Sequence, residues 1–397
     1  MKETSRLIVA LIIALFSINF AFSQSNNEKN EEIEEIKDQI SGIDERLLTA
    51  ESDLAKLKSI KISGYVQAQL QKAESNVTPK SSFSIRRARV KVTYEASDQA
   101  RFVVQPDFLP TGFSLKDAYL QVNKLGTKEL SLWVGQFNRT NYEVEYSSGQ
   151  RETPERSRLI RAIYPSEREI GMKLEYESKN LPLKAQLALF NGNFTGTQNA
   201  DVDNFKDIMA RVTYSLSMPR SGIGIDFGAH AYIGNVAATS TTLLNSDYST
   251  STINAGDGIG KTWFGGELQF YMDLLGGMAI KGEYITGTTA TATQQKDFAG
   301  YYLYLIKNIG ISHQFVLKYD YYDPNTKFSA NDIGTNGSGS SDISYNTLTL
   351  AWQYYWDDNI RITLAYEMPI NETTDNLPAF KKDVIDNTLT LRFQSRF

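Results

Sequence analysis

A row of basic residues makes the predicted strand 83–95 the part of this chain best suited to bind anions. Arg87, Arg89 and Lys91 alternate with apolar residues, so a strand places them on one face, about 7 Å apart. Arg86 has the opposite parity and is expected near the mouth of any channel that this face lines. Such rows select anions by replacing part of their hydration shell, and the planar fork of arginine binds phosphate oxygens in two places.

Carboxylates offer an alternative interpretation of the same row, because neighbouring acids could neutralise it. Many positions predicted to face the same side in other strands are acidic, namely Asp107, Asp117, Glu175, Glu177, Asp226, Glu267 and Glu367. The formal net charge of −5 opposes nucleic-acid binding and also warns against assuming that a pore here prefers anions. Both interpretations stay open at this stage.

A second group of charged residues fills the long segment 138–168, which the sequence predicts as a loop. A loop of this length without its own secondary structure is usually functional. Its apolar patch (Leu159, Ile160 and Ile163) suggests packing against a channel wall near Tyr65 or Trp133. A mobile surface loop is the alternative. If the loop folds inward, it adds four arginines to the candidate anion pathway: Arg151, Arg156, Arg158 and Arg161.

Residues for covalent or metal chemistry are scarce. The chain has two histidines, His230 and His313, and no cysteine. Neither histidine has an obvious nucleophile as a partner, and a metal site would need more ligands of this kind. The sequence therefore predicts no enzymatic activity, no metal and no cofactor.

The elements that must position these residues are strands. Sixteen segments alternate apolar and polar residues, as strands with an apolar and a polar face do. In the last of them, Leu389, Leu391, Phe393 and Phe397 share one parity, while Thr390, Arg392, Gln394 and Arg396 take the other. The predicted strands are 60–71, 83–95, 99–107, 114–123, 129–137, 169–177, 183–191, 206–217, 222–234, 261–272, 275–287, 299–307, 312–323, 343–355, 359–367 and 385–397.

Short turns after even-numbered strands and mostly long loops after odd-numbered ones are typical of an all-β, antiparallel transmembrane barrel with an apolar outside and a polar inside. The 22 Tyr and 20 Phe would supply its interfacial girdles. Sixteen strands leave an aqueous channel. The C-terminal Phe397 resembles the signal by which the barrel-assembly machinery recognises such proteins. A soluble β-propeller or sandwich is the alternative, but neither would produce this rhythm of connections.

The N-terminus predicts the compartment. Lys2 and Arg6 precede an apolar stretch from Leu7 to Phe22, and small residues follow. This is the pattern of a signal peptide, residues 1–23, because the stretch is shorter than the roughly 20 apolar residues of a spanning helix. The predicted location is the outer membrane of a Gram-negative bacterium, with lipid around the barrel, residues 60–397.

Residues 24–59 predict a short α-helical coiled coil in the periplasm. Apolar residues recur at alternating steps of three and four, and charges of opposite sign flank them. Isoleucine at both core positions of the heptad favours coiled coils of more than two helices, so a homotrimer is expected. An amphipathic helix on another surface, or a solvated linker, is the alternative. The predicted seam contains Ile33, Ile36, Ile40, Ile43, Leu47, Ala50, Leu54 and Leu57.

The barrel region also resembles the family of phosphate-selective porins O and P. The residues that carry the resemblance are 86–90, 117–120, 135–137 and 155–171. The resemblance implies a sixteen-stranded trimeric porin whose arginines guide anions, such as phosphate or polyphosphate, to a narrow central site. The alternatives are a non-selective diffusion porin and a barrel that only anchors a coiled-coil tether.

Overall fold

The computed structural model describes residues 46–49, 51, 58–75, 79–139, 144–145, 148–193, 201–273 and 276–397. The chain divides into two units, Met1–Ile60 and Lys61–Phe397. In the first unit, Leu47 lies in a helical turn at 46–49 and is exposed. The predicted signal peptide and the other seam residues lie outside the described residues. Among the described residues, no helix is long and apolar enough to cross a membrane.

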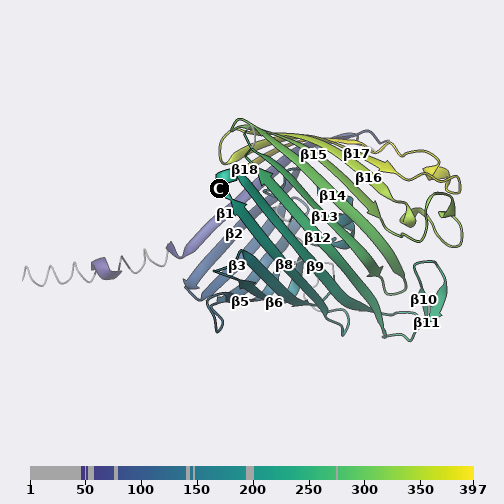
Figure 1. Ribbon diagram of the computed structural model, residues 1–397, viewed down its shortest axis with the longest axis horizontal. Helices are drawn as coiled ribbons and strands as arrows, with labels where there is room; N and C mark the ends of the chain where they lie inside the picture. The colour runs from purple at the N-terminus through teal and green to yellow at the C-terminus, as the bar shows by residue number, and fades with distance from the viewer. Residues whose placement is uncertain are drawn as a thin grey trace, which may run out of the picture. The chain divides into compact units, whose positions relative to one another are not determined.

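The second unit is a closed antiparallel barrel of sixteen strands (Figure 1), which confirms the predicted barrel. Each strand pairs with its neighbours in chain order, and a separate two-stranded sheet, β10–β11, is inserted between β9 and β12. The barrel strands are β1 (Ile60–Ala73), β2 (Ser81–Ser97), β3 (Ala100–Leu109), β4 (Gly112–Asn123), β5 (Leu130–Asn138), β6 (Arg168–Glu177), β7 (Leu183–Phe190), β8 (Asp207–Met218), β9 (Ile223–Ala237), β12 (Gly258–Met272), β13 (Met278–Ala290), β14 (Gln295–Ile309), β15 (His313–Asp323), β16 (Tyr345–Tyr355), β17 (Ile360–Asn371) and β18 (Thr388–Arg396).

Connections at the two ends of the barrel differ in length. At the turn end, a short segment joins each even-numbered predicted strand to the strand that follows it. The segment between β8 and β9 contains the 3₁₀ turn Pro219–Ser221. The loop end carries the long segments 139–167, 191–206, 238–257, 324–344 and 372–387, but also the short connections 110–111 and 291–294. Among their described residues, the loop-end segments contain β10 (Thr242–Leu244), β11 (Thr250–Thr252), the α-helix α2 (Arg158–Ile163), and the 3₁₀ turns Ala330–Asp332, Ser340–Asp342 and Pro378–Phe380.

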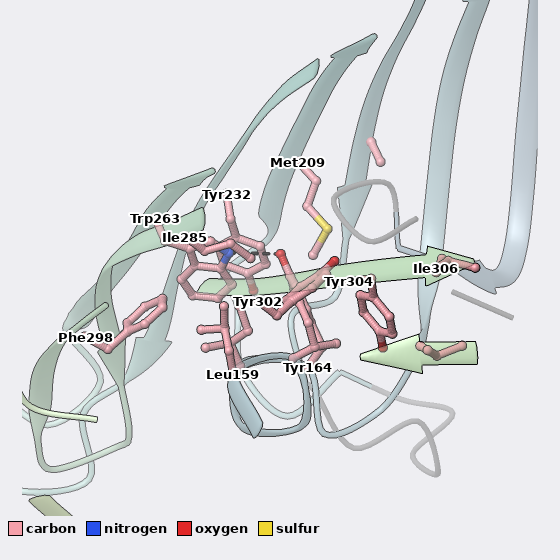
Figure 2. Packing of buried hydrophobic residues seen from close by; sticks show 14 of the residues in the cluster. Leu159, Tyr164, Met209, Tyr232, Trp263, Ile285, Phe298, Tyr302, Tyr304 and Ile306 are labelled. Carbon is pink, nitrogen blue, oxygen red and sulfur yellow. Dashed lines mark hydrogen bonds between the residues drawn. The ribbon is translucent and has the colours of Figure 1, made fainter. Parts of the chain in front are cut away.

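The strands form because their apolar and polar residues alternate, which suits a sheet with one face toward lipid and the other toward the lumen. On β14, Leu303 and Leu305 point outward and are exposed, whereas Tyr302 and Tyr304 are buried inside. The main core cluster therefore lies in the lumen, where aromatic side chains of β5, β7, β9, β12 and β14 meet (Figure 2). This is the inverse of a soluble sandwich, whose core lies between two sheets.

The first and last strands close the barrel. β1 pairs with β18 in a continuous register from Tyr65↔Arg396 to Ala73↔Thr388. Beyond this register, Gly64 and Phe397 exchange two backbone hydrogen bonds of 3.0 and 3.1 Å. A Cβ atom added to Gly64 would lie 2.3 Å from the carbonyl oxygen of Arg89 and 2.7 Å from Cζ of Phe397. Only glycine therefore lets β1, β2 and the C-terminal residue meet here.

Replacing Gly64 by valine should obstruct closure, because the new side chain collides with the backbone of β2. Overpacking of this kind costs about 1–3 kcal/mol or more. We expect a lower yield of folded barrel, measured by the shift in electrophoretic mobility between unheated and heated samples. Gly339→Ala is the control, because a Cβ there meets nothing within 4 Å. Equal yields from both variants would contradict the proposed role of Gly64.

Candidate functional site

The described residues of the loop between β5 and β6 (139, 144–145 and 148–167) lie inside the barrel. Side chains from five consecutive strands donate hydrogen bonds to its backbone carbonyls. The donors are Gln67 on β1 (to Ser148, 2.8 Å), Gln394 on β18 (to Gly149, 2.9 Å), Arg392 on β18 (to Pro154, 2.8 Å), Arg361 on β17 (to Gly149, 3.1 Å), Gln353 on β16 (to Glu152, 2.5 Å) and Lys318 on β15 (to Glu155, 3.2 Å). We call this segment the inner loop.

The apolar patch of the inner loop packs on the wall formed by β12, β14 and β15. Helix α2 carries the patch, and its N-cap Ser157 accepts a hydrogen bond from the backbone N–H of Ile160. Leu159 lies beside Tyr164 and Trp263 (Figure 2). Leu159 also packs over Gly300 of β14. A Cβ atom added to Gly300 would lie 2.8 Å from Cδ1 of Leu159. Trp133 borders this cluster, as expected.

Tyr65 does not contact the patch, contrary to the sequence-based expectation. Its hydroxyl lies 2.5 Å from Oγ of Ser148, in the first half of the inner loop. The expectation was wrong for Tyr65 because the inner loop crosses the lumen. Its polar first half contacts β1, β17 and β18, and its helix contacts the wall beyond them.

A buried carboxylate holds the two halves of the inner loop together. Glu145 accepts hydrogen bonds from the backbone N–H of Ser157 at 2.9 Å and from its hydroxyl at 2.7 Å. The hydroxyl of Tyr304, on β14, donates to the same carboxylate. A buried carboxylate needs several donors, and these contacts supply them. Glu145 therefore fastens both the turn before α2 and the loop as a whole to the wall.

The predicted basic row on β2 faces the lumen and meets carboxylates there. Arg86 forms a two-pronged pair with Glu155 of the inner loop, at 3.0 and 2.9 Å. Arg86 therefore turns toward the inner loop, although its parity in the strand predicted a position near the mouth of the channel. Arg89 pairs with Asp107 at 2.9 Å, and Arg87 Nε lies 3.8 Å from the same carboxylate.

Two nitrogen atoms of this row have no hydrogen-bond partner within the described residues. They are Nε of Arg87 and Nη2 of Arg89, and both are buried. Their carboxylate neighbours, Asp107 and Glu167, lie 3.8 and 3.7 Å away, beyond hydrogen-bond distance. A buried donor without a partner is costly. These two donors therefore keep an unused capacity to form a hydrogen bond.

The four predicted arginines of the inner loop have different surroundings. Arg151 is buried and donates to the backbone carbonyls of Thr153 and Pro154, so it braces the loop itself. Arg156 donates to the carbonyl of Tyr164. The guanidinium of Arg158 stacks on the ring of Tyr345 at 3.6 Å, and Arg161 lies 3.6 Å from a carboxylate oxygen of Glu367.

The predicted set omits three basic residues of the lumen that the structure brings to the inner loop. Arg168 pairs with Asp117 at 2.9 Å, Arg392 with Glu155 at 3.1 Å, and Lys281 with Glu152 at 2.6 Å. Their inward parity in β6, β18 and β13 was available as a signal. Their partners were not, because each ion pair joins segments more than 50 residues apart in the chain.

A cavity of about 310 Å³ lies between the inner loop and the wall of β1–β4. Four cationic side chains line it, against the single carboxylate of Asp117. The cations belong to Arg89, Lys91, Arg168 and Arg396. Because Arg168 already pairs with Asp117, the lining keeps a surplus of positive charge. This cavity is the candidate site for a small anion.

Arginines also determine the charge of Glu167, at the end of the inner loop. Burial alone would raise the pKa of this carboxyl group, but Arg168 and Arg89 outweigh it and lower the pKa of Glu167 to about 2. Glu167 is therefore ionised at neutral pH and reduces the positive charge around Arg89. The carboxylates of this region balance part of the basic row without cancelling it.

The two histidines have structural contacts. Nε2 of His230 lies 2.7 Å from a carboxylate oxygen of Glu283, and both side chains are buried in the wall. Nδ1 of His313 accepts a hydrogen bond of 3.2 Å from Trp352 on the outer face. Both contacts orient side chains within the sheet.

The chain is similar to known proteins in sequence and in fold. The family described as phosphate-selective porin O and P matches residues 60–269, about half of the chain. No curated protein matches the sequence. The fold is similar to OprB of Pseudomonas putida, with a TM-score of 0.61, 9% identity, and coverage of 86% of this chain and 94% of that chain.

Two further solved structures share the fold. The anion-selective porin of Comamonas acidovorans has a TM-score of 0.55 and 10% identity, over 85% of this chain and 99% of that chain. The trimer form of OmpT of Vibrio cholerae has a TM-score of 0.55 and 13% identity, over the same shares. At identities this low, the similarity concerns the fold alone.

Replacing Tyr304 by phenylalanine should loosen the inner loop, because Glu145 loses a donor. A hydrogen bond to a charged group contributes about 1.5–3 kcal/mol, so amides of residues 148–163 should exchange with deuterium roughly 10- to 100-fold faster. Tyr366→Phe is the control, because it removes a hydroxyl bonded to Glu74 outside the lumen. Unchanged exchange in Tyr304→Phe would rule out this anchor.

The low pKa of Glu167 predicts how the inner loop responds to acid. Its ionised form is favoured in the folded protein, so its stabilising contribution is complete above the usual pKa of 4.5 and is lost as the pH falls through about 2. The protection of amides around Glu167, measured relative to their intrinsic exchange rate at each pH, should therefore begin to fall below about pH 4.5 and be lost progressively toward about pH 2. Glu167→Gln should remove this pH dependence. Protection that stays constant from pH 4.5 to pH 2 in the unmodified protein would contradict the assignment.

Proposed function

Because this chain belongs to the family of phosphate-selective porins O and P, we propose that it forms a water-filled channel for small anions, such as phosphate or polyphosphate, across the outer membrane. The supporting observation is the cavity with surplus positive charge that Arg89 lines, on a basic row in which Arg87 and Arg89 each keep a buried guanidinium nitrogen without a partner among the described residues. Phosphate oxygens suit such donors, since charge-assisted hydrogen bonds to guanidinium are short and strong.

The inner loop is the proposed constriction. It occupies one side of a lumen that would otherwise be too wide to sense the charge of a small ion, because water and salt screen charges beyond about 8 Å. By placing Glu155 and Glu167 against Arg86 and Arg89, it also holds the basic row in fixed directions. An anion passing the loop on the side of β1–β4 would meet Arg89, and then Lys91 nearer the turn end.

A non-selective diffusion porin is the second candidate. Extensive ion pairing supports it, because Arg86, Arg89 and Arg168 each have a carboxylate within 3.0 Å. If those pairs cancel the field, the reversal potential in a salt gradient would lie near zero. A barrel that only anchors a tether would give no conductance at all.

The proposal includes the parts of the chain that precede the barrel. We infer that residues 1–23 are removed as a signal peptide and that residues 24–59 lie in the periplasm, where their heptads hold three copies together. The trimer form of OmpT, which shares the fold, is compatible with such an assembly. The N-terminal pattern and the assembly role of Phe397 stay predictions.

Replacing Arg87 and Arg89 together by serine should shift the selectivity of the channel toward cations. The two changes remove both unpartnered donors and leave Asp107 without its close partner. Reversal potentials in planar bilayers under a salt gradient should show the anion-to-cation permeability ratio falling several-fold. The control is Arg220→Ser with Lys382→Ser, because both residues are exposed outside the lumen. An unchanged reversal potential in Arg87/Arg89 variants would favour the non-selective candidate.

A further inference from the structure

A β-bulge interrupts the regular alternation of β4. Gln105 of β3 pairs with Asp117, but the next residue of β3, Pro106, pairs with Leu115, so Lys116 is an extra residue with no partner on β3. Proline has no backbone N–H to donate to a neighbouring strand, and bulges are among the places where sheets accommodate it. An extra residue of this kind bends the strand and can re-aim a side chain.

The bulge turns Lys116 toward the lumen. In an unbroken strand Lys116 would face lipid, because its neighbour Asp117 is buried on the lumen side. Instead, Leu115 is exposed on the outer face and Lys116 is half-buried. Four charged side chains of the lumen act on the ammonium group of Lys116: Arg89, Arg87, Glu167 and Asp107. Lys116 therefore extends the basic row of β2, although it belongs to β4.

Two residues of β5 hold the bulge in place. The side-chain amide of Gln136 donates hydrogen bonds to the backbone carbonyls of Leu115 and Lys116, at 2.7 and 2.8 Å. Beside it, Gly135 has a φ of +128°, and a Cβ atom there would lie 2.3 Å from the carbonyl oxygen of Ala118 on β4. Glycine thus lets β5 approach the bent strand closely. The direction of Lys116 is therefore fixed by the strands on both sides of β4.

Lys116 differs from the arginines of the row in its surroundings. Asp107 lies 2.9 Å from Arg89 and 3.8 Å from Arg87, and Glu167 lies 3.7 Å from Arg89. Among the described residues, by contrast, no carboxylate forms an ion pair or a hydrogen bond with the ammonium group of Lys116. Lysine also has a flexible stem and three donors that can turn toward a passing solute. Its charge is thus available in the folded protein.

We propose that Lys116 is a specificity-determining residue of the channel, which the bulge in β4 places beside Arg87 and Arg89 to bind the passing anion. The inference rests on the proposed anion channel and adds to its pathway a residue that strand alternation alone assigns to the lipid face. Asp107 and Glu167 offset much of the charge of the arginines, whereas Lys116 contributes a charge that no described carboxylate pairs with. A flexible cation also suits conduction, which requires binding that is weak enough for the ion to leave.

Cysteine accessibility tests the direction of the bulge, because the chain has no cysteine of its own. Lys116→Cys and Leu115→Cys are each reconstituted in planar bilayers and exposed to an anionic, membrane-impermeant methanethiosulfonate. The reagent should modify the Lys116→Cys channel and reduce its single-channel current, and it should leave the Leu115→Cys channel unchanged because that position faces lipid. Modification of the Leu115→Cys channel alone, or of neither channel, would overturn the inward placement of Lys116.

Reversal potentials in a KCl gradient test the role of the charge. Lys116→Gln should lower the permeability ratio of chloride to potassium about two- to five-fold, because a cleft lined by one sign of charge concentrates the counter-ion. Lys116→Arg, which keeps the charge, should preserve the ratio. Lys80→Gln is the matched control, because it removes the same charge from an exposed position between β1 and β2. Each variant is first checked for the mobility shift of a folded barrel.

The outcomes separate this inference from the proposed function. If Lys116→Gln leaves the permeability ratio unchanged while the double replacement of Arg87 and Arg89 lowers it, the role of Lys116 is overturned and the anion channel stands. If none of these variants lowers the ratio, both proposals are overturned. An equal fall in Lys116→Gln and Lys80→Gln would also overturn the role of Lys116, because it would report net charge alone.

Discussion

The backbone of a sheet in lipid has no water to satisfy its N–H and C=O groups, so the sheet must close on itself. Closure depends here on β1 and β18, which lie at opposite ends of the barrel sequence and pair over nine residues. Gly64 and Phe397 extend that pairing at the turn end. Once the ring is closed, every strand has one face toward lipid and one toward the lumen. All polar and charged side chains of the inner face must then find partners inside.

The inner loop supplies partners for the inward-facing side chains on one side of the lumen. A sixteen-strand barrel is too wide for side chains of its wall to meet across it. The loop supplies a helix with three buried apolar residues for the aromatic wall, and backbone carbonyls for the polar side chains of β15–β18 and β1. One of the spaces that remain lies toward β1–β4, beside the basic row. The asymmetry of the lumen thus follows from where the loop packs.

Electrostatics inside the lumen is a compromise between stability and solute binding. Arginines that line a protein interior need counter-charges, and Asp107, Glu155 and Glu167 provide them. If carboxylates accepted hydrogen bonds from every guanidinium donor, no donor would remain to bind a solute. At 3.8 and 3.7 Å from Arg87 Nε and Arg89 Nη2, the carboxylates of Asp107 and Glu167 balance the charge without accepting a hydrogen bond from these two atoms. A preference for anions would then come from geometry more than from net charge, which is negative for the chain as a whole.

Local patterns in the sequence were sufficient to predict the sixteen strands, their facing and the lumen position of Arg87, Arg89 and Lys91. A strand alternates with a period of two regardless of its neighbours, so facing can be read from a single segment. Which residues meet across the lumen could not be read in this way. Arg86 turns to Glu155, and the apolar patch packs on β12, β14 and β15 while Tyr65 contacts Ser148, because the inner loop crosses the barrel. Only closure of the ring and packing of that loop bring such distant segments together, so only the tertiary structure decides which cations are paired and which keep a donor for a solute.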